Sequence, residues 1–308
     1  MLDYLATTAF QLPPPEVIMQ LILSGIAFGS IYAMVAVGFN IIYNATGIIN
    51  LAQGEFVMLG GMLMVFAHDK LGLPVWAALL FSVFLVMAIG VIFERLAIRP
   101  VKKPSVLLLI IITIAGSFIF RGAALLIWGD QYYSFEQFLG DEPVRLLGAS
   151  VTRQHLIVLA TLLLVAVGLF FFFGFTMIGK AMRATSFNRT AARLVGINAR
   201  NMVMLAFGLS AAIGALAGTV VAPITGAKYD DGVMFGLKGF SAAVLGGLGN
   251  NPAAVAAGLI LGVLEAFAGY SPLSNYKEAV VLFLLIVVLF IRPSGIFGKT
   301  ELSKLSEF

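Results

Sequence analysis

Side chains that could perform chemistry are scarce in this sequence of 308 residues. It contains no cysteine and only two histidines, His68 and His155, which both lie near the ends of apolar runs. The absence of cysteine excludes disulfides, thiol catalysis and zinc sites built from cysteine. No group of histidine, aspartate and serine suggests a catalytic site. We therefore expect no catalytic residue, no metal site and no enzyme activity in this chain.

Two short stretches come close to a phosphate-binding loop. In GFTMIGKA (residues 174–181) the glycine and lysine spacing fits, but Ala181 replaces the hydroxyl that would bind magnesium. In PSGIFGKT (residues 293–300), Pro293 stands in place of the first glycine. Neither stretch is expected to follow a buried strand, as such a loop does. We therefore expect this chain to bind no cofactor and to leave ATP hydrolysis to another protein.

The composition places the chain in a membrane. Hydrophobic residues make up 60% of the sequence and charged residues 11%, whereas a soluble domain has about 25% charged residues. A bilayer accepts such a chain as helices of about 20 apolar residues each. Runs of suitable length cover residues 17–43, 50–67, 73–93, 105–128, 154–177, 202–224 and 277–291.

One further region, residues 235–270, is too long for a single crossing and is interrupted by GGLGNNP at residues 246–252. The pattern predicts two helices that meet at a break, with Asn251 capping the second and Pro252 in its first turn. The fold class expected is therefore all-α. It is a polytopic bundle of eight or nine membrane segments, including broken or re-entrant helices, in one domain over residues 1–308.

A second break is expected in IIYNATGIINLAQGEFVMLGG (residues 41–61), where polar side chains separate two apolar runs. Asn50 and Gln53 have the spacing of a capping box, and Glu55 would lie near the positive end of the new helix. Transporters expose their backbone to solutes at broken helices. Both breaks are therefore candidates for a polar pathway. The candidate residues are Asn44, Asn50, Gln53, Glu55, Gly246, Gly247, Asn250 and Asn251.

Three charged residues, Glu55, Arg121 and Glu265, lie deep in apolar runs. A carboxylate in a membrane span costs about 2.5–3.5 kcal/mol on insertion scales, so such a residue usually marks a pathway or has a partner. Glu55 either lines the pathway or only satisfies a helix end, and the sequence leaves both open. Arg121 and Glu265 could pair across the bundle.

Three pairs of glycines spaced by four also lie in apolar runs. Each pair shares one helix face and would let two backbones approach closely. We expect ordinary helix packing within one subunit from them. The pairs are Gly25 with Gly29, Gly214 with Gly218, and Gly258 with Gly262.

Basic residues collect in three regions, which should face the cytoplasm because cytoplasmic loops carry an excess of Lys and Arg. The net charge of +4 therefore indicates orientation and no nucleic-acid partner. The acid-rich residues 129–153 should face outward. Residues 1–16 lack the basic start of a cleavable signal, so we expect the first helix to stay, and residues 292–308 form a cytoplasmic tail. Twelve of the 19 basic residues make up the three groups: Arg95, Arg99, Lys102 and Lys103; Lys180, Arg183, Arg189, Arg193 and Arg200; Arg292, Lys299 and Lys304.

The densest basic group lies in GKAMRATSFNRTAARLVGINAR (residues 179–200), which has five basic residues and no acid. Small residues follow helical spacings of three and four, which predicts one helix that ends at Gly196. The segment could be a loop that only fixes orientation. A smooth alanine face, however, fits a groove on a partner protein better than it fits lipid headgroups. That face consists of Ala181, Ala184, Asn188, Ala191 and Val195.

Four stretches, in order, resemble one known family. They are GSIYAMVAVGFNIIYNATGIINLAQGEFVMLGG from Gly29, GKAMRATSFNRTAARLVGIN from Gly179, GLKGFSAAVLGGLGNNPAAVAAGLILGVLE from Gly236 and FIRPSGIFG from Phe290. The chain resembles, nearly end to end, the LivH-like permeases of the branched-chain amino acid type of ATP-binding-cassette importer.

The resemblance implies a bacterial inner-membrane subunit that works with a second permease, identical or related. It also implies two cytoplasmic ATPases that bind ATP and magnesium, and a periplasmic solute-binding protein. Residues 179–198 would then be the coupling segment, held in a groove of an ATPase, although Phe187 stands where relatives should have a polar residue. The coupling residues implied are Gly179, Arg183, Ala184, Asn188, Arg189, Ala191, Gly196 and Asn198.

Two functions remain to be compared. The first is the permease subunit of an ATP-driven importer for branched-chain amino acids or related small polar solutes, working by alternating access. The second is a self-sufficient channel or ion-coupled transporter that uses Glu55 and Glu265. No residue decides among branched-chain amino acids, urea, amides and other carboxylates as the solute.

Overall fold

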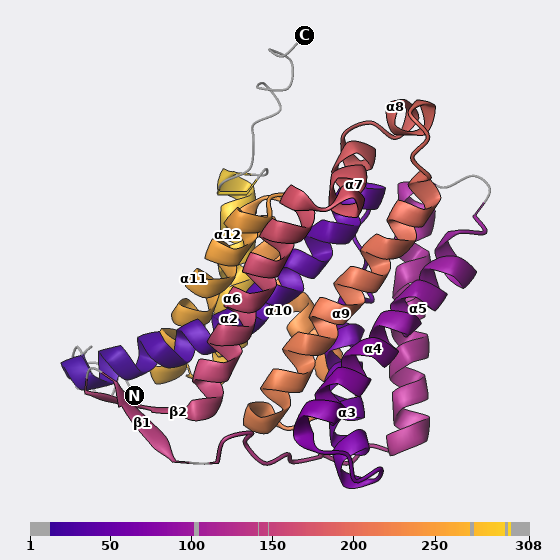
Figure 1. Ribbon diagram of the computed structural model, residues 1–308. Helices are drawn as coiled ribbons and strands as arrows, with labels where there is room; N and C mark the ends of the chain where they lie inside the picture. Colours follow the sequence, from indigo (N-terminus) through magenta and orange to yellow (C-terminus); the bar gives the residue numbers. More distant parts are fainter. Residues whose placement is uncertain are drawn as a thin grey trace.

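The computed structural model describes residues 13–101, 105–140, 142–146, 148–271, 274–292 and 295–296. Within these residues, eleven α-helices form a bundle with one β-hairpin at an end (Figure 1). In chain order the elements are α2 (Pro15–Thr46), α3 (Gln53–Asp69), α4 (Val75–Phe93), the π-helical turn η1 (Glu94–Ile98), α5 (Val106–Trp128), β1 (Pro143–Leu146), β2 (Ala149–Thr152), α6 (Arg153–Phe175), α7 (Met177–Phe187), α8 (Arg189–Leu194), α9 (Ala199–Thr225), α10 (Asp231–Gly246), α11 (Asn251–Tyr270), the 3-10 turn η2 (Ser274–Tyr276) and α12 (Lys277–Ile291).

Seven helical segments are long and apolar enough to cross a membrane: α2, α4 with η1, α5, α6, α9, α11, and α12 with η2. Two further helices, α3 and α10, have 17 and 16 residues. At 1.5 Å per residue they are about 25 Å long, which is shorter than the bilayer's hydrocarbon core of about 30 Å. The predicted all-α polytopic bundle is confirmed. Its seven long and two short helices agree with the approximate count of eight or nine.

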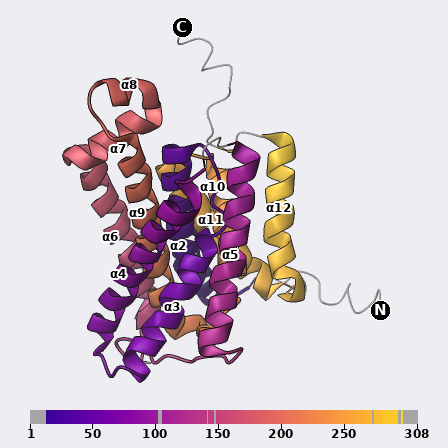
Figure 2. The ribbon, with the colours of Figure 1, turned by 90° about the vertical axis from the view of Figure 1, so that its right-hand side faces the viewer.

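The helices form an inner and an outer set. Side chains of α2, α3 and α9 are mostly buried. These helices pack on one another; α2 also packs on α10 and α11, and α3 on α10. Few residues of α5, α6 and α12 are buried, and their exposed side chains are mostly apolar. Figure 2 shows α5 at the surface of the bundle, in front of the inner helices. An exposed apolar helix surface of this kind suits contact with lipid or with another membrane chain.

The two ends of the bundle differ in charge, as the sequence predicts. The basic helices α7 and α8 lie at the same end as the end of α12 (Figure 1). Arg99, after η1, donates to Asn201 at the start of α9 and so belongs to that end too (3.3 Å). The β-hairpin and the start of α2 lie at the other end, where Gln20 accepts from the Ser150 N–H (2.8 Å). Lys102, Lys103, Lys299, Lys304 and most of residues 1–16 and 292–308 lie outside the described residues.

Glycines bring the backbones of the inner helices into contact. A Cβ atom added at Gly25 would lie 2.5 Å from Val263 Cα, and one added at Gly258 would lie 2.6 Å from the Ala33 nitrogen. One at Gly262 would overlap the Gly25 carbonyl oxygen. The α2 and α11 glycines therefore pack on each other within this subunit, as expected. Close backbone contact of this kind supplies the dispersion attraction that holds membrane helices together.

We predict that Gly262→Ala lowers the free energy of unfolding by about 1–3 kcal/mol, because the added methyl forces α2 and α11 apart. Thermal unfolding of the purified protein in detergent measures the effect. The matched control is Gly168→Ala in α6, where a Cβ meets nothing within 4 Å. Equal melting temperatures for the two variants would contradict the prediction.

Candidate translocation and coupling sites

The break between α2 and α3 begins at the exposed Gly47 and runs into the bundle, where Asn50 and Ala52 are buried. Gly47 ends α2 in the left-handed conformation (φ 77°), and its N–H donates to the Tyr43 carbonyl oxygen (2.7 Å). Residues 48–52 are not helical. The Leu51 N–H donates to Thr113 Oγ1 of α5 (3.2 Å), and the Ala52 N–H donates to Asn50 Oδ1 (3.2 Å). The predicted break is therefore present, and side chains satisfy part of its backbone.

The predicted capping box between Asn50 and Gln53 is wrong. Ala52 is the residue before α3 and makes no side-chain cap. Gln53 turns away to α9, where its Oε1 lies 2.7 Å from the Ser210 hydroxyl and its Nε2 donates to the Ser210 carbonyl oxygen (3.3 Å). The same hydroxyl lies 2.8 Å from the Gly38 carbonyl oxygen of α2. Gln53 thus ties three helices together at the start of α3.

Glu55 lies in the first turn of α3, is 2% exposed and pairs with Arg121 of α5 (3.2 Å). Ser117 donates to the same carboxylate oxygen, Oε1 (2.7 Å). The starts of α3 and α10 also meet here, because Gly54 and Gly232 have no side chains to separate them. A carboxylate beside two helix N-termini is favoured by their partial positive charge. Glu55 therefore lies beside two helix ends and pairs with the cation Arg121, and the proposed pair of Arg121 with Glu265 is wrong.

Glu265 has other partners. Lys238 of α10 donates to its Oε1 (2.7 Å), and the Tyr32 hydroxyl of α2 donates to its Oε2 (2.7 Å). Glu278 at the start of α12 lies 3.9 Å from Lys238. The cluster is largely buried and joins α2, α10, α11 and α12. The sequence analysis did not single out Lys238. A lysine in an apolar stretch usually has a charged partner, and this signal could have identified it.

The second predicted break is the turn between α10 and α11. Asn44 at the end of α2 donates to the Gly249 carbonyl oxygen (3.0 Å), and Asn40 accepts from the Gly249 N–H (2.9 Å). The Ile296 N–H donates to the Leu245 carbonyl oxygen (2.7 Å). These contacts place the turn at the basic end of the bundle, away from Glu55. The structure thus divides the candidate pathway residues into two groups.

The prediction that Asn251 caps α11 is off by one residue. Asn250 is the cap, and its Oδ1 accepts from the Ala253 N–H (3.2 Å). Asn251 and Pro252 occupy the first two helical positions, where a proline has no lost hydrogen bond. Gly247 and Gly249 before the cap have φ values of 92° and 91°, which side chains rarely adopt.

The predicted single helix over the basic segment is also wrong. α7 ends at Phe187, and Asn188 has extended dihedral angles (φ −151°, ψ 106°). Its Oδ1 then accepts from the N–H groups of Thr190 and Ala191 (both 3.0 Å), so Asn188 caps a new helix, α8. An asparagine can leave a helix in this way because its side chain replaces the lost backbone partner. The alanines on the two sides of Asn188 therefore do not form one continuous face.

Most of the predicted coupling residues lie on the surface. Arg183, Ala184, Asn188, Arg189, Ala191, Gly196 and Asn198 are exposed. Gly179 is different, since it is buried and a Cβ there would overlap the Phe172 carbonyl oxygen of α6. Gly196 follows α8 with φ 86°, and Asn198 caps α9 by accepting from the Asn201 N–H (3.2 Å). Beside these residues Phe187, Leu194 and Val195 are 95%, 84% and 76% exposed. We call the exposed residues 183–198 the α7–α8 surface.

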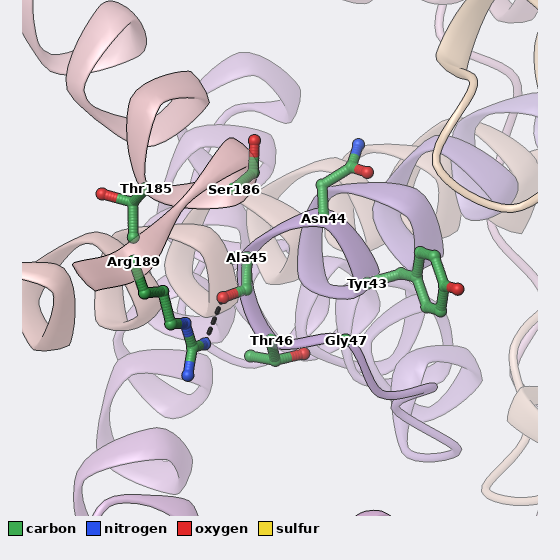
Figure 3. A pocket seen from close by; sticks show the side chains of 8 residues that line it. All are labelled: Tyr43, Asn44, Ala45, Thr46, Gly47, Thr185, Ser186 and Arg189. Carbon is green, nitrogen blue, oxygen red and sulfur yellow. Dashed lines mark hydrogen bonds between the residues drawn. The ribbon is translucent and has the colours of Figure 1, made fainter. Parts of the chain in front are cut away.

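A cleft of about 370 Å³ separates the α7–α8 surface from the end of α2. Arg189 reaches across it and donates to the carbonyl oxygen of Ala45 (Figure 3). The last carbonyls of a helix lack partners within the helix and favour a positive charge. Burial of the guanidinium and the charge of Arg193 lower the pKa of Arg189, yet an arginine stays protonated. The cleft is lined by Tyr43, Asn44, Ala45, Thr46, Gly47, Thr185, Ser186 and Arg189.

A family model described as the permease component of branched-chain amino acid transport systems matches residues 21–289. The chain belongs to this family. Over 305 residues it is 32% identical to BraD of Pseudomonas aeruginosa, described as a high-affinity branched-chain amino acid transport system permease protein, covering 93% of this chain and 97% of BraD. Over 299 residues it is 32% identical to LivH of Escherichia coli, which has the same description, with the same coverage.

The permease is also similar to a second protein of E. coli. It is 23% identical over 298 residues to LivM, another high-affinity branched-chain amino acid transport system permease protein, covering 88% of this chain and 68% of LivM. One chain is thus similar to two permease proteins described with the same words. Together with its seven long apolar helices, these relatives identify it as a multi-pass membrane protein.

The structure of the permease adds Thr113 and Ser117, which the sequence analysis did not single out, to Arg121, which it did. Thr113, Ser117 and Arg121 are spaced by four and form a polar row on α5 that faces the α2–α3 break. The signal was present in TIAGSFIFR, because polar residues at this spacing share one helix face. We call this set the α5 polar row.

We predict that Lys238→Met destabilises the permease by about 3–5 kcal/mol, because Glu265 would remain buried without its cation. Thermal unfolding in detergent measures the loss, and Lys238→Met with Glu265→Gln should recover most of it. Lys228→Met is the control, since the Lys228 and Asp230 pair is partly exposed and should contribute less than about 1 kcal/mol. Equal losses for Lys228→Met and Lys238→Met would refute the role given to the buried cluster.

Proposed function

We propose that this chain is the membrane-spanning permease subunit of an ATP-driven importer for branched-chain amino acids or related small polar solutes. Residues 1–308 would form one permease domain in the inner membrane of a bacterium. The observation that carries the proposal is the α7–α8 surface of a chain in this family. There, apolar side chains are almost fully exposed beside basic ones at the basic end of the bundle.

Two cytoplasmic ATPases are the partners that this surface suits. Phe187, Leu194 and Val195 would be out of water only if another protein covered them. Arg183 and Arg193 beside them would pair with acidic side chains of that protein. Phe187, which departs from the polar residue expected in relatives, would then supply an apolar anchor. ATP and magnesium would be bound by these ATPases, and this chain would bind no cofactor.

Arg189 supports a route for coupling. It joins α8 to the Ala45 carbonyl at the end of α2, directly before the α2–α3 break. A movement of the α7–α8 surface would therefore pull on the helix that leads into the break. In alternating access, such a pull would exchange outward-facing and inward-facing arrangements of the bundle.

A second permease subunit would complete the membrane pathway. The exposed apolar surfaces of α4, α5 and α12 offer room for it, and the similarity to both LivH and LivM favours a related partner. A periplasmic solute-binding protein would deliver solute at the end that carries the β-hairpin.

The pathway would use the two groups of polar residues in sequence. Asn50, Gln53 and Glu55 lie where the N-termini of α3 and α10 meet inside the bundle. Asn44, Gly246, Gly247, Asn250 and Asn251 lie at the basic end, near the α10–α11 turn. Solute would pass the first group before the second. The names of the relatives favour branched-chain amino acids, whereas urea, amides and other carboxylates are the other solutes to test.

The alternative is a self-sufficient channel or ion-coupled transporter that uses Glu55 and Glu265. In the structure each carboxylate is paired with a cation, Arg121 or Lys238. The relatives support the permease component and do not support this alternative.

We predict that Arg183→Glu or Gly196→Val abolishes ATP-driven uptake of leucine while the subunit remains in the membrane. The first reverses a charge on the α7–α8 surface, and the second strains a left-handed turn. Uptake into cells, with the amount of subunit measured by immunoblot, tests this. Lys70→Glu, an exposed base at the opposite end, should transport normally. Unchanged uptake in both coupling variants would rule out the docking role.

We also predict that liposomes containing this chain alone show no leucine flux, because the energy source and half of the pathway lie in other subunits. Flux should appear when ATPases, second permease, binding protein and ATP are added. Gradient-driven flux through the single chain, indifferent to ATP, would favour the self-sufficient alternative.

A further inference from the structure

Arg121 occupies an unusual place on α5. It lies about 10 Å from the Trp128 end of the helix and about 22 Å from the Val106 end, at 1.5 Å per residue. This position is well inside the apolar span. Its side chain is nevertheless 27% exposed, on a helix at the surface of the bundle (Figure 2).

The guanidinium of Arg121 is only partly satisfied. Its Nη2 donates to Glu55 Oε1 and to Ser117 Oγ (both 3.2 Å). Nε and Nη1 make no hydrogen bond within the described part of the chain. A guanidinium has five N–H donors and no acceptor, so each accessible N–H can donate to a carboxylate oxygen. Nε is buried, so the donors of Arg121 left for a ligand are the N–H groups of Nη1.

The surroundings of Arg121 on the exposed side are apolar. Ile114, Phe118 and Leu125 lie on the same face of α5 and are exposed, and the guanidinium lies 5.5 Å from the centre of the Phe118 ring. Lipid cannot satisfy a charged group with free donors. A ligand that covers this face should therefore have a polar group at Arg121 and apolar groups against the side chains on both sides of it. An aliphatic amino acid has both features, a carboxylate and an apolar side chain.

We propose that Arg121 binds the carboxylate of the transported solute, with Phe118 and Leu125 in contact with its aliphatic side chain. The inference rests on the proposed importer function and extends it, because it restricts the solutes to those that carry a carboxylate. Glu55 and Ser117 are positioning residues, since they hold Nη2 and leave Nη1 to donate to the solute. Urea and simple amides, which have no carboxylate, would not be bound here.

Cysteine labelling can test the site because this chain has no cysteine of its own. Leu125→Cys, one turn from Arg121, should react with a charged methanethiosulfonate reagent in the reconstituted importer. L-Leucine should slow the reaction, and L-leucinamide, which lacks the carboxylate, should not. Adding Arg121→Gln should raise the half-protecting leucine concentration at least about tenfold, the loss expected for a charged hydrogen-bonded pair. Leu126→Cys, on another face of α5, should show no effect of leucine.

Three results would overturn the inference. One is protection by leucine that persists unchanged with Arg121→Gln. Another is equal protection by leucinamide. The third is slow labelling of Leu125→Cys that leucine does not alter, which is the result expected if a carboxylate of the second permease occupies Arg121.

A double variant separates binding from a structural role. If Arg121 only neutralises buried Glu55, Glu55→Gln with Arg121→Gln should restore the uptake lost in Arg121→Gln. If Arg121 binds solute, uptake by the double variant should stay low, while Glu55→Gln alone keeps part of the transport. Uptake by the unmodified importer is measured beside these variants. Absence of leucine uptake there would count against the proposed function itself, whereas normal uptake by the double variant would count only against Arg121.

Discussion

Broken helices inside an apolar bundle are the constraint on which the rest of this structure depends. A backbone that leaves a helix at membrane depth loses hydrogen bonds that lipid cannot replace. Here α5 supplies Thr113 to the Leu51 N–H, and Gln53 joins α3 to Ser210 and to the region of Gly38. The helices beside the break, α5 and α9, thus contribute polar groups to it as well as packing surface. This explains why α5, which has little other contact with the inner helices, carries a polar row.

The same break concentrates charge in one place. The starts of α3 and α10 meet through glycines, and Glu55 lies between these two positive helix ends while Arg121 pairs with it. A second charged cluster around Lys238 holds α10 against α2, α11 and α12. The short helices are therefore held by ion pairs as well as by close glycine contacts.

The basic end of the bundle connects an exposed surface to this interior. Asn188 divides the segment into α7 and α8, and the turn it makes brings Arg189 over the end of α2. One side of the segment is then free for a partner, and the other side contacts the helix that leads into the break. The α10–α11 turn is attached to the same part of α2 through Asn40 and Asn44. The end of α2 is thus where several elements of the basic end of the bundle meet.

The sequence by itself determined the membrane class, both helix breaks, the sidedness of the basic groups and the family resemblance, because each depends on local composition or spacing. It did not determine the partners. Arg121 pairs with Glu55 and not with Glu265, Lys238 takes Glu265, and Gln53 reaches Ser210 instead of capping α3. These residues lie from 27 to 157 positions apart, and only the packing of helices decides which of them meet. Tertiary structure also decided that Asn188 divides the basic helix. The chain turns at Asn188, and this turn brings Arg189 to the end of α2.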